Sequence, residues 1–262
     1  MASIQDLPGD VTRSVLYLLD DTDLMNACSV NKDFSNRLCN DSFWLNKIIN
    51  KYGLTAEQIN KYKKDNTYLA YYLKLNEDTK NRNPADILRM IQRLNFYGRE
   101  DLVIIALNRG ADIHNKDDEA LRYASSHSPA EIVRLLLENG ADVHARNDES
   151  LKRVVGRRGT EDVVKLLLEY GADVHARNDE ALTWASLNGS IDTVKLLLEY
   201  GADVHARNDE ALSRASEYGH IDIVKLLLEY GADVHANNDG ALRAATTNGH
   251  REIAELLLKQ TL

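Results

Sequence analysis

The stretch Lys165–Leu212 contains the 18-residue sequence KLLLEYGADVHARNDEAL twice, starting at Lys165 and again at Lys195. A slightly altered third copy starts at Lys225. Recurrence at a fixed period of about 20–50 residues is typical of a solenoid, in which each unit buries its apolar face against its neighbours. The block carries no catalytic motif. It therefore predicts that most of this chain is a scaffold for binding.

A five-residue landmark, Gly-Ala-Asp-(Ile/Val)-His, marks the period. Its copies are spaced by 30, 31, 30 and 30 residues and begin at Gly110, Gly140, Gly171, Gly201 and Gly231. Apolar residues around the landmark recur at three-and-four spacing rather than in alternation, as Leu182 does with Ala185 and Val194 with Leu197. Such spacing predicts helices instead of strands.

Each unit is predicted to be a helix, a tight turn, a second helix and a loop. In one unit, Asn178 or Asp179 can cap the first helix, and Gly189 interrupts it. A second helix is expected from about Ile191–Tyr200, and Gly201 supplies the left-handed residue that ends it. Helices of about two to three turns are not stable alone, so stacking must hold the units.

These features resemble the ankyrin repeat. The matching letters recur in register: Ala-Ser or Ala-Ala in the first helix, Asn-Gly-His or a relative at the turn, Ile/Val-Val-x-Leu-Leu-Leu in the second helix, and Gly-Ala-Asp-Val. The resemblance implies an all-α, ankyrin-type helical solenoid over residues 84–262, with about six helix pairs. A degenerate first pair starts at Pro84 and turns at Gly98, and Leu256–Lys259 closes the array.

Two departures from the ankyrin pattern affect the expected structure. The usual unit has about 33 residues and carries Gly-x-Thr-Pro-Leu-His after a β-hairpin finger, whereas here that stretch shrinks to Asn-Asp-Glu-Ala-Leu. We therefore expect blunted fingers with little regular strand. One unit also has an extra residue within Gly156–Gly159, which we place at the turn between its helices.

A histidine recurs once per repeat, which suggests either a metal site or a structural ladder. The five are His114, His144, His175, His205 and His235. Stacked helical layers lie about 8–10 Å apart, whereas zinc holds each ligand nitrogen at about 2 Å, so neighbouring histidines cannot share an ion. In ankyrin proteins this position is usually Asn, which bonds across to the next loop. We expect His to replace it and predict no metal or cofactor.

In ankyrin proteins the partner usually lies against the finger tips and first helices. The matching positions vary between repeats here while the framework stays nearly constant, and Tyr, Trp and Arg are frequent at interface hot spots. The arginines among them form a basic stripe suited to an acidic partner segment, although unselected surface drift also explains such variation. The predicted target-binding residues are Tyr123, His127, Arg146, Arg153, Arg157, Arg177, Trp184, Asn188, Arg207, Arg214, Tyr218 and Asn248.

The first 50 residues do not follow the repeat. Leu-Pro-x-acid, apolar residues at helical spacing, acid-Leu, Val-x-Lys-x-Phe and a late Trp run from Leu7 to Trp44, with Phe43 and Trp44 expected to anchor a third helix. This arrangement resembles an F-box, with residues 51–83 as a helical connector that ends in a polar link, Glu77–Asn83. The F-box family docks on the Skp adaptor of cullin ubiquitin ligases, through positions that here are Leu7, Pro8, Val11, Val15, Leu16, Leu19, Leu24 and Val30. Alternatively, these residues form the core of a helical cap on the first repeat.

Charge and composition exclude several classes of protein. The net charge of −9 comes entirely from residues 76–262, which carry 32 acidic and 23 basic residues, and such an acidic array is poorly suited to a phosphate backbone. We expect no nucleic-acid partner. Only two cysteines, no long apolar run and no leader predict a chain that works in a reducing cytoplasm without a membrane.

No motif in the chain predicts catalysis, because a Gly-rich phosphate loop, a Cys–His pair and a Ser nucleophile motif are all missing. The sequence favours a non-enzymatic, monomeric substrate receptor that links an unknown target protein to an SCF-type ubiquitin ligase. The alternative is an ankyrin protein that binds or sequesters its target. Fusion of an F-box-like unit to short ankyrin repeats is similar to proteins of large DNA viruses, which would place this chain in a host cytoplasm.

Overall fold

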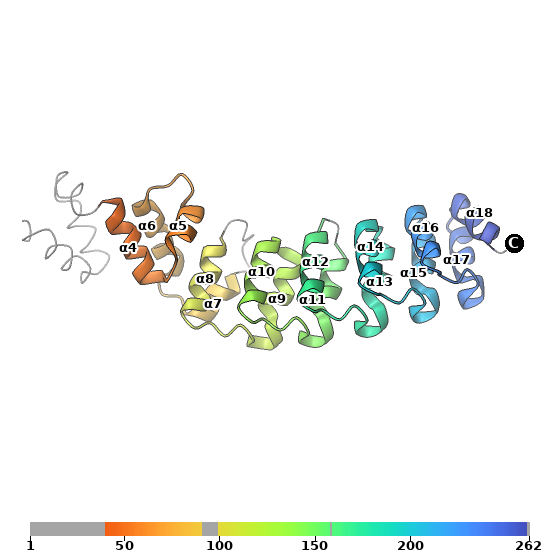
Figure 1. Cartoon of the computed structure of the whole chain (residues 1–262), viewed down its shortest axis with the longest axis horizontal. Coiled ribbons are helices and arrows are strands. Elements are labelled where there is room, and N and C mark those ends of the chain that lie inside the picture. The colour runs from red at the N-terminus through yellow and green to blue at the C-terminus, as the bar shows by residue number, and fades with distance from the viewer. Residues whose placement is uncertain (1–39, 91–98, 158, 261–262) are drawn as a thin grey trace, which may run out of the picture. The chain divides into compact units, whose positions relative to one another are not determined.

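The computed structural model describes residues 40–90, 99–157 and 159–260 and divides the chain into two compact units (Figure 1). The described part of unit 1 is residues 40–90 and 99–112, and that of unit 2 is 113–157 and 159–260. Every regular element in these ranges is a helix, and they contain no strand, which confirms the predicted all-α class and agrees with the expectation of little regular strand in the fingers. No described helix is long and apolar enough to span a bilayer. The predicted adaptor-binding residues, Leu7 to Val30, lie outside the described ranges.

Unit 1 begins with helices that carry clear start signals. Asn40 accepts a hydrogen bond from the backbone of Phe43, and Thr55 and Gln58 form a capping box. Pro84 stands in the first turn of its helix, as predicted. The helices are α4 (Asp41–Tyr52), α5 (Ala56–Lys63), α6 (Tyr68–Thr79), α7 (Pro84–Arg89) and α8 (Glu100–Asn108). Because α6 extends to Thr79, the predicted polar link is shorter than expected.

Large aromatic side chains fill the core of unit 1. Trp44, Tyr52 and Tyr72 are almost fully buried, and the ring centroids of Trp44 and Tyr72 lie 5.2 Å apart. Phe43 meets Trp44 edge to face at 5.1 Å. The prediction that Phe43 and Trp44 anchor a helix is confirmed by α4.

A buried polar cluster joins α6 to α8 within unit 1. The Tyr71 hydroxyl donates to Asp101 Oδ2 at 2.8 Å, and Arg99 pairs with both Asp101 (3.1 Å) and Asp78 (2.6 Å). Burial, followed by the charge of Asp101, raises the pKa of Tyr71. Burial raises the pKa of neighbouring Tyr62 to about 12, with help from the charges of Glu100 and Asp101. Packing thus places α7 and α8, which the sequence predicts as the first pair of the array, in unit 1.

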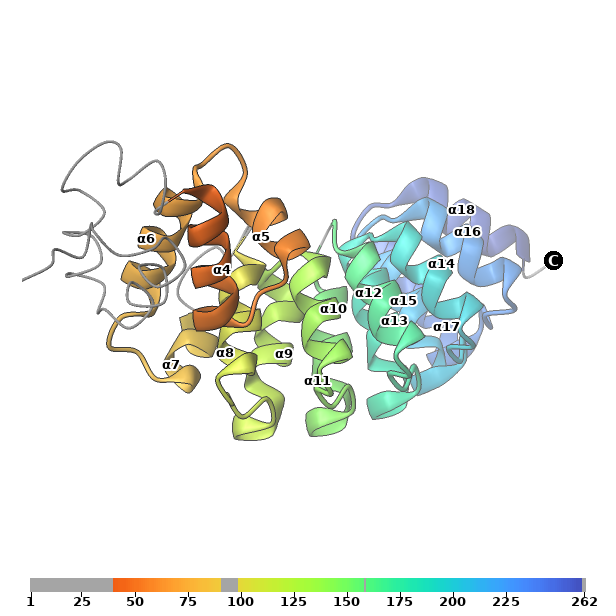
Figure 2. The same cartoon turned by 60° about the vertical axis from the view of Figure 1, so that its left-hand side comes forward.

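Unit 2 consists of helix pairs in two layers (Figure 2). The first helices of successive repeats pack against one another, and so do the second helices. First helices are α9 (Asn115–His127), α11 (Ala145–Val155), α13 (Ala176–Asn188), α15 (Ala206–Glu217) and α17 (Ala236–Thr247). Second helices are α10 (Ala130–Glu138), α12 (Glu161–Glu169), α14 (Ile191–Glu199), α16 (Ile221–Glu229) and α18 (Arg251–Gln260).

The predicted positions of the turn and of the helix end within a repeat are confirmed. Gly189 and Gly201 have φ of 74° and 93°, so both are left-handed, and α14 between them ends one residue before the predicted bound. The extra residue of the longer unit lies in the connection between α11 and α12. Small and branched apolar side chains from the two helix layers, such as Ala185 and Leu197, make up the core.

A left-handed turn precedes the helical part of each first helix. Three successive residues have φ between 53° and 61°, a conformation that costs most residues about 1–2 kcal/mol and that, apart from glycine, Asn and Asp tolerate best. We call each triplet a finger; they are Lys116–Asp118, Arg146–Asp148, Arg177–Asp179, Arg207–Asp209 and Asn237–Asp239. The prediction that Asn178 or Asp179 caps a helix is wrong, because both residues belong to a finger and no side-chain cap is formed there.

Candidate functional site

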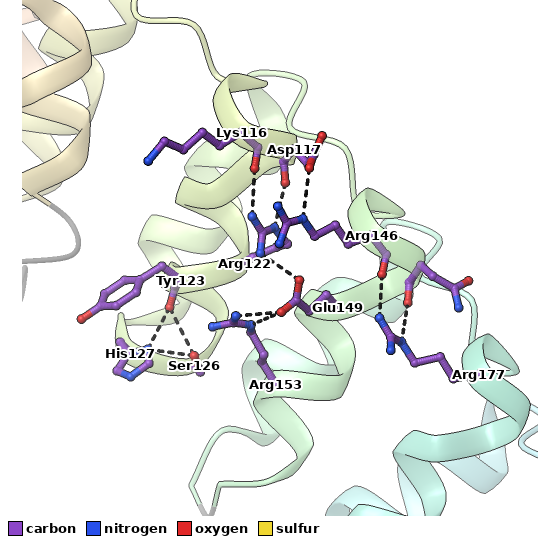
Figure 3. Close-up of polar contacts among 11 residues, drawn as sticks. Lys116, Asp117, Arg122, Tyr123, Ser126, His127, Arg146, Glu149, Arg153 and Arg177 are labelled. Atoms are coloured by element: carbon purple, nitrogen blue, oxygen red, sulfur yellow. Dashed lines mark hydrogen bonds and ion pairs between the residues drawn. The ribbon is translucent and has the colours of Figure 1, made fainter.

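The candidate site is the surface made by the fingers and the first helices of unit 2, which we call the finger face. Nine of the twelve predicted target-binding residues belong to these elements; Tyr218 and Asn248 are the C-caps of α15 and α17, and Arg157 is exposed in the connection after α11. The structure therefore gathers residues from five repeats onto one helix layer. Figure 3 shows the contacts in its first part.

Buried aspartates connect each finger to the next repeat. The last residue of a finger accepts a hydrogen bond at 2.8 Å from the backbone N–H of the next Gly-Ala-Asp aspartate. The pairs are Asp118 with Asp142, Asp148 with Asp173, Asp179 with Asp203, and Asp209 with Asp233. These four finger aspartates are almost fully buried, whereas Asp239 in the fifth finger is 50% exposed at its side chain. The inter-repeat ladder is thus built from carboxylates.

The histidines do not form the predicted ladder. Each Nδ1 lies 2.7–3.2 Å from the finger aspartate four residues later in its own repeat, and more than half of each side chain is exposed. The prediction that His bonds across to the next loop is wrong, because the finger aspartate accepts the hydrogen bond from the backbone N–H of that loop. Within the described ranges, no group of three metal-binding side chains converges.

Arginine side chains bind the carbonyl oxygens of the fingers. Arg177 donates to Arg146 O at 2.9 Å and to Asn147 O at 3.3 Å (Figure 3). Arg207 donates to Arg177 O at 2.6 Å. Arg146 pairs with Asp117 at 3.0 Å. The predicted fingertip arginines therefore reach back to the preceding finger, which uses part of their hydrogen-bonding capacity for stacking.

The first and last fingers are bound by an arginine of their own helix. Arg122 donates to Lys116 O at 2.9 Å and to Asp117 O at 2.8 Å. Arg243 makes the same pair of contacts, with Asn237 O at 3.0 Å and with Asn238 O. Within the described ranges, no arginine binds the carbonyl oxygens of the finger Arg207–Asp209.

A glutamate follows each of the first four fingers and neutralises nearby cations. Glu149 pairs with Arg122 at 2.8 Å and Arg153 at 2.7 Å (Figure 3). Burial opposes ionisation of Glu149, but the hydrogen bonds and charges of both arginines outweigh it and hold the pKa below its ordinary value. This row of glutamates is Glu119, Glu149, Glu180 and Glu210, and Gly240 takes its place in the fifth repeat.

The next two glutamates of the row act in the same way. Glu180 pairs with Lys152 at 3.0 Å and accepts from Trp184 Nε1 at 3.3 Å; burial opposes ionisation, but these bonds lower its pKa. The hydrogen bonds that Arg214 donates to Glu210 and Glu217 raise the pKa of Arg214. The predicted basic stripe is therefore largely neutralised by glutamates that sequence reasoning overlooked, although their i,i+4 spacing to Arg153 and Arg214 was a usable signal.

Aromatic side chains give the finger face its exposed apolar area. Trp184 is 39% and Tyr218 51% exposed, and Tyr123 stacks on His127 with ring centroids 4.3 Å apart. The predicted contacts Asn188 and Asn248 each donate to a carbonyl four residues earlier, that of Trp184 and Ala244 respectively. The face can thus bind a partner through aromatic contacts within a rim of paired charges.

Comparison with known families agrees with this architecture. A family model described as ankyrin repeats in three copies matches residues 154–208 and 206–261, and a single ankyrin-repeat model matches residues 120–148. Together they cover just over half of the chain. No curated protein sequence matches it. Ankyrin repeats are protein-binding modules that typically lack catalytic activity, and this chain belongs to the ankyrin-repeat family.

Proposed function

We propose that the finger face holds a target protein through Trp184, Tyr218 and the arginines around them. The observation that supports this most is the contrast within the repeats: the framework residues are nearly constant, while equivalent exposed or half-buried first-helix positions hold Tyr123, Arg153, Trp184 and Arg214. Exposed aromatic rings beside arginines are the usual composition of interface hot spots.

We further propose that the N-terminal residues attach this target to a Skp-type adaptor of a cullin ubiquitin ligase in the cytoplasm. The support is the F-box-like pattern from Leu7 to Trp44, whose last part, Phe43 and Trp44, is buried at the start of α4. In this function the chain is a substrate receptor, and the ligase's other subunits carry out catalysis. A viral origin would make that ligase the host's.

Affinity capture from a eukaryotic lysate tests the two parts separately. We expect the wild-type chain to recover Skp and cullin, and the double variant Leu7→Asp/Pro8→Ala to lose them while keeping the target. The opposite pattern is expected for Trp184→Ala/Tyr218→Ala. Tyr230→Ala is the matched control, since Tyr230 is a similarly exposed aromatic residue that follows the second helix α16. Recovery of a target without Skp or cullin would leave a binding or sequestering protein whose N-terminal helices are a cap.

A further inference from the structure

A polar pocket of about 270 Å³ lies between α15 and α17. Its wall on α15 includes Ser213 and Arg214, and its wall on α17 includes Gly240 and Arg243. Both helices belong to the finger face, so the pocket opens on the surface that we propose for target binding.

Gly240 lines the pocket and stands at the position that holds a glutamate in the first four repeats. Glu149 and Glu180 each bind a cation of the preceding repeat, at 2.8 Å and 3.0 Å. Gly240, at the equivalent position, contributes only a hydrogen, and a Cβ there would lie 3.2 Å from Ser213 Oγ. A glutamate at residue 240 would thus add a carboxylate to the pocket lining, beside Ser213 of the preceding repeat rather than beside a cation.

The charges around the pocket leave one cation without a carboxylate partner. Glu210 and Glu217 both pair with Arg214, at 3.0 and 2.9 Å. Arg243 forms no ion pair with any residue in the described ranges, and its hydrogen bonds go to the carbonyl oxygens of its own finger. The residues that line the pocket thus carry one more positive than negative charge.

Arg122 shows that an arginine at this position of a repeat can pair with a carboxylate. It stands at the same position in the first repeat and binds its own finger in the same way. Its remaining donor, Nη1, lies 2.8 Å from Glu149 Oε2 of the following repeat. Arg243 binds the equivalent two carbonyl oxygens, but through Nη1 and Nη2, and has no carboxylate partner in the described ranges. Arg–carboxylate pairs are among the strongest charge-assisted hydrogen bonds.

We propose that this pocket is a subsite for an acidic side chain of the bound protein, whose carboxylate pairs with Arg243 above Gly240. The proposal rests on the proposed target binding by the finger face and specifies its chemistry. A Glu or Asp of the partner then supplies the carboxylate that residue 240 lacks. The fifth repeat therefore selects for an acidic partner sequence, whereas the glutamates of the other repeats already pair with cations of the array.

NMR titration with N-acetyl-glutamate methylamide, and with its glutamine analogue, tests the subsite directly. In the wild-type chain the glutamate probe should shift the signals of Gly240 and Arg243 Nε, and the glutamine probe should bind at least about tenfold more weakly, a difference of about 1.4 kcal/mol. Arg243→Gln keeps the side-chain size and should remove that discrimination. Gly240→Glu restores the residue found in four other repeats and should abolish the response, whereas Gly240→Ala should preserve it.

Equal shifts from both probes, no shift from either, or an undiminished glutamate response in Arg243→Gln or Gly240→Glu would overturn the subsite. Failure of the subsite is distinguishable from failure of target binding. A protein captured equally well by the wild-type chain and Gly240→Glu, but lost with Trp184→Ala/Tyr218→Ala, would remove the acidic subsite and leave the finger face as the binding surface.

Discussion

The two units of this chain are stabilised in different ways. Unit 1 concentrates its core in a few large aromatic side chains, among them Trp44 and Tyr72, and in one buried polar cluster around Asp101. Unit 2 repeats a small set of Ala, Val and Leu contacts and one aspartate bond from repeat to repeat. The comparison implies that single substitutions should damage unit 1 through lost volume and unit 2 through lost connections between repeats.

The largest effect is expected for Trp44→Ala. Removing this buried ring should destabilise unit 1 by about 3–5 kcal/mol, because a cavity replaces its contacts with Phe43 and Tyr72. Hydrogen exchange should show lost protection in α4 and α6. Trp184→Ala is the control, because this second tryptophan is exposed and should change protection little. Preserved exchange in α4 and α6 of Trp44→Ala would contradict an aromatic core.

A smaller loss is expected for Asp209→Ala in unit 2. The substitution removes the acceptor for the Asp233 N–H and should lower the free energy of unfolding by about 1–3 kcal/mol, measured by urea denaturation. Asp239→Ala is the matched control, because Asp239 is half-exposed and no described backbone N–H of a further repeat binds it. Equal losses of unfolding free energy in the two variants would show that the hydrogen bond from the Asp233 N–H to Asp209 contributes nothing to stability. His205→Asn should cost less than Asp209→Ala, since the His205 ring is mostly exposed.

Tyr71→Phe tests the polar cluster of unit 1. The loss of the hydroxyl leaves one oxygen of the buried Asp101 without its donor at 2.8 Å, and we expect a destabilisation of about 1–2 kcal/mol. Tyr68→Phe removes a hydroxyl that bonds Asn60 at the surface and should be nearly neutral. If thermal denaturation gives the same result for both variants, the cluster is not a stabilising contact.

The smallest effect that we expect is on the thermal stability of the chain at acidic pH. The pKa of Glu149 in the folded chain lies below its ordinary value of 4.5, so its stabilising contribution is fully present above that pH and is lost as pH falls through the lowered pKa. The melting temperature of wild type should therefore fall more steeply below about pH 5 than that of Glu149→Gln. Glu138→Gln, at an exposed glutamate outside the row, should keep the wild-type profile. Parallel profiles for all three proteins would exclude a role for the row in acid stability.

The repeat architecture was predictable because its signals are local and occur several times. Five copies of the landmark fixed the period, and the left-handed glycines and apolar spacing located α14 within one residue. The strand-free fingers followed from the shortened segment before each first helix. Because the same pattern occurs several times, it predicts the helices less ambiguously than the pattern of a single short helix would.

The polar partners were not predictable, because several side chains compete for one loop in three dimensions. His205 and Asp209 lie close together in the sequence, and only the folded finger decides that the aspartate reaches the Asp233 N–H. The left-handed finger itself was overlooked, although two Asn or Asp residues in most triplets indicate it. Likewise, the placement of α7 and α8 in unit 1 depends on long-range contacts that no repeat pattern contains.

The unequal binding of the fingers has a consequence for local motion. Four fingers have carbonyl oxygens bound by an arginine, whereas among the described residues no arginine binds those of Arg207–Asp209, which must keep the same unfavourable backbone without that support. We expect this finger to be the most adaptable point of the array and to exchange its amide hydrogens fastest. Arg207 also lines the pocket beside Gly240. We therefore expect a bound acidic side chain to reduce the motion of this finger.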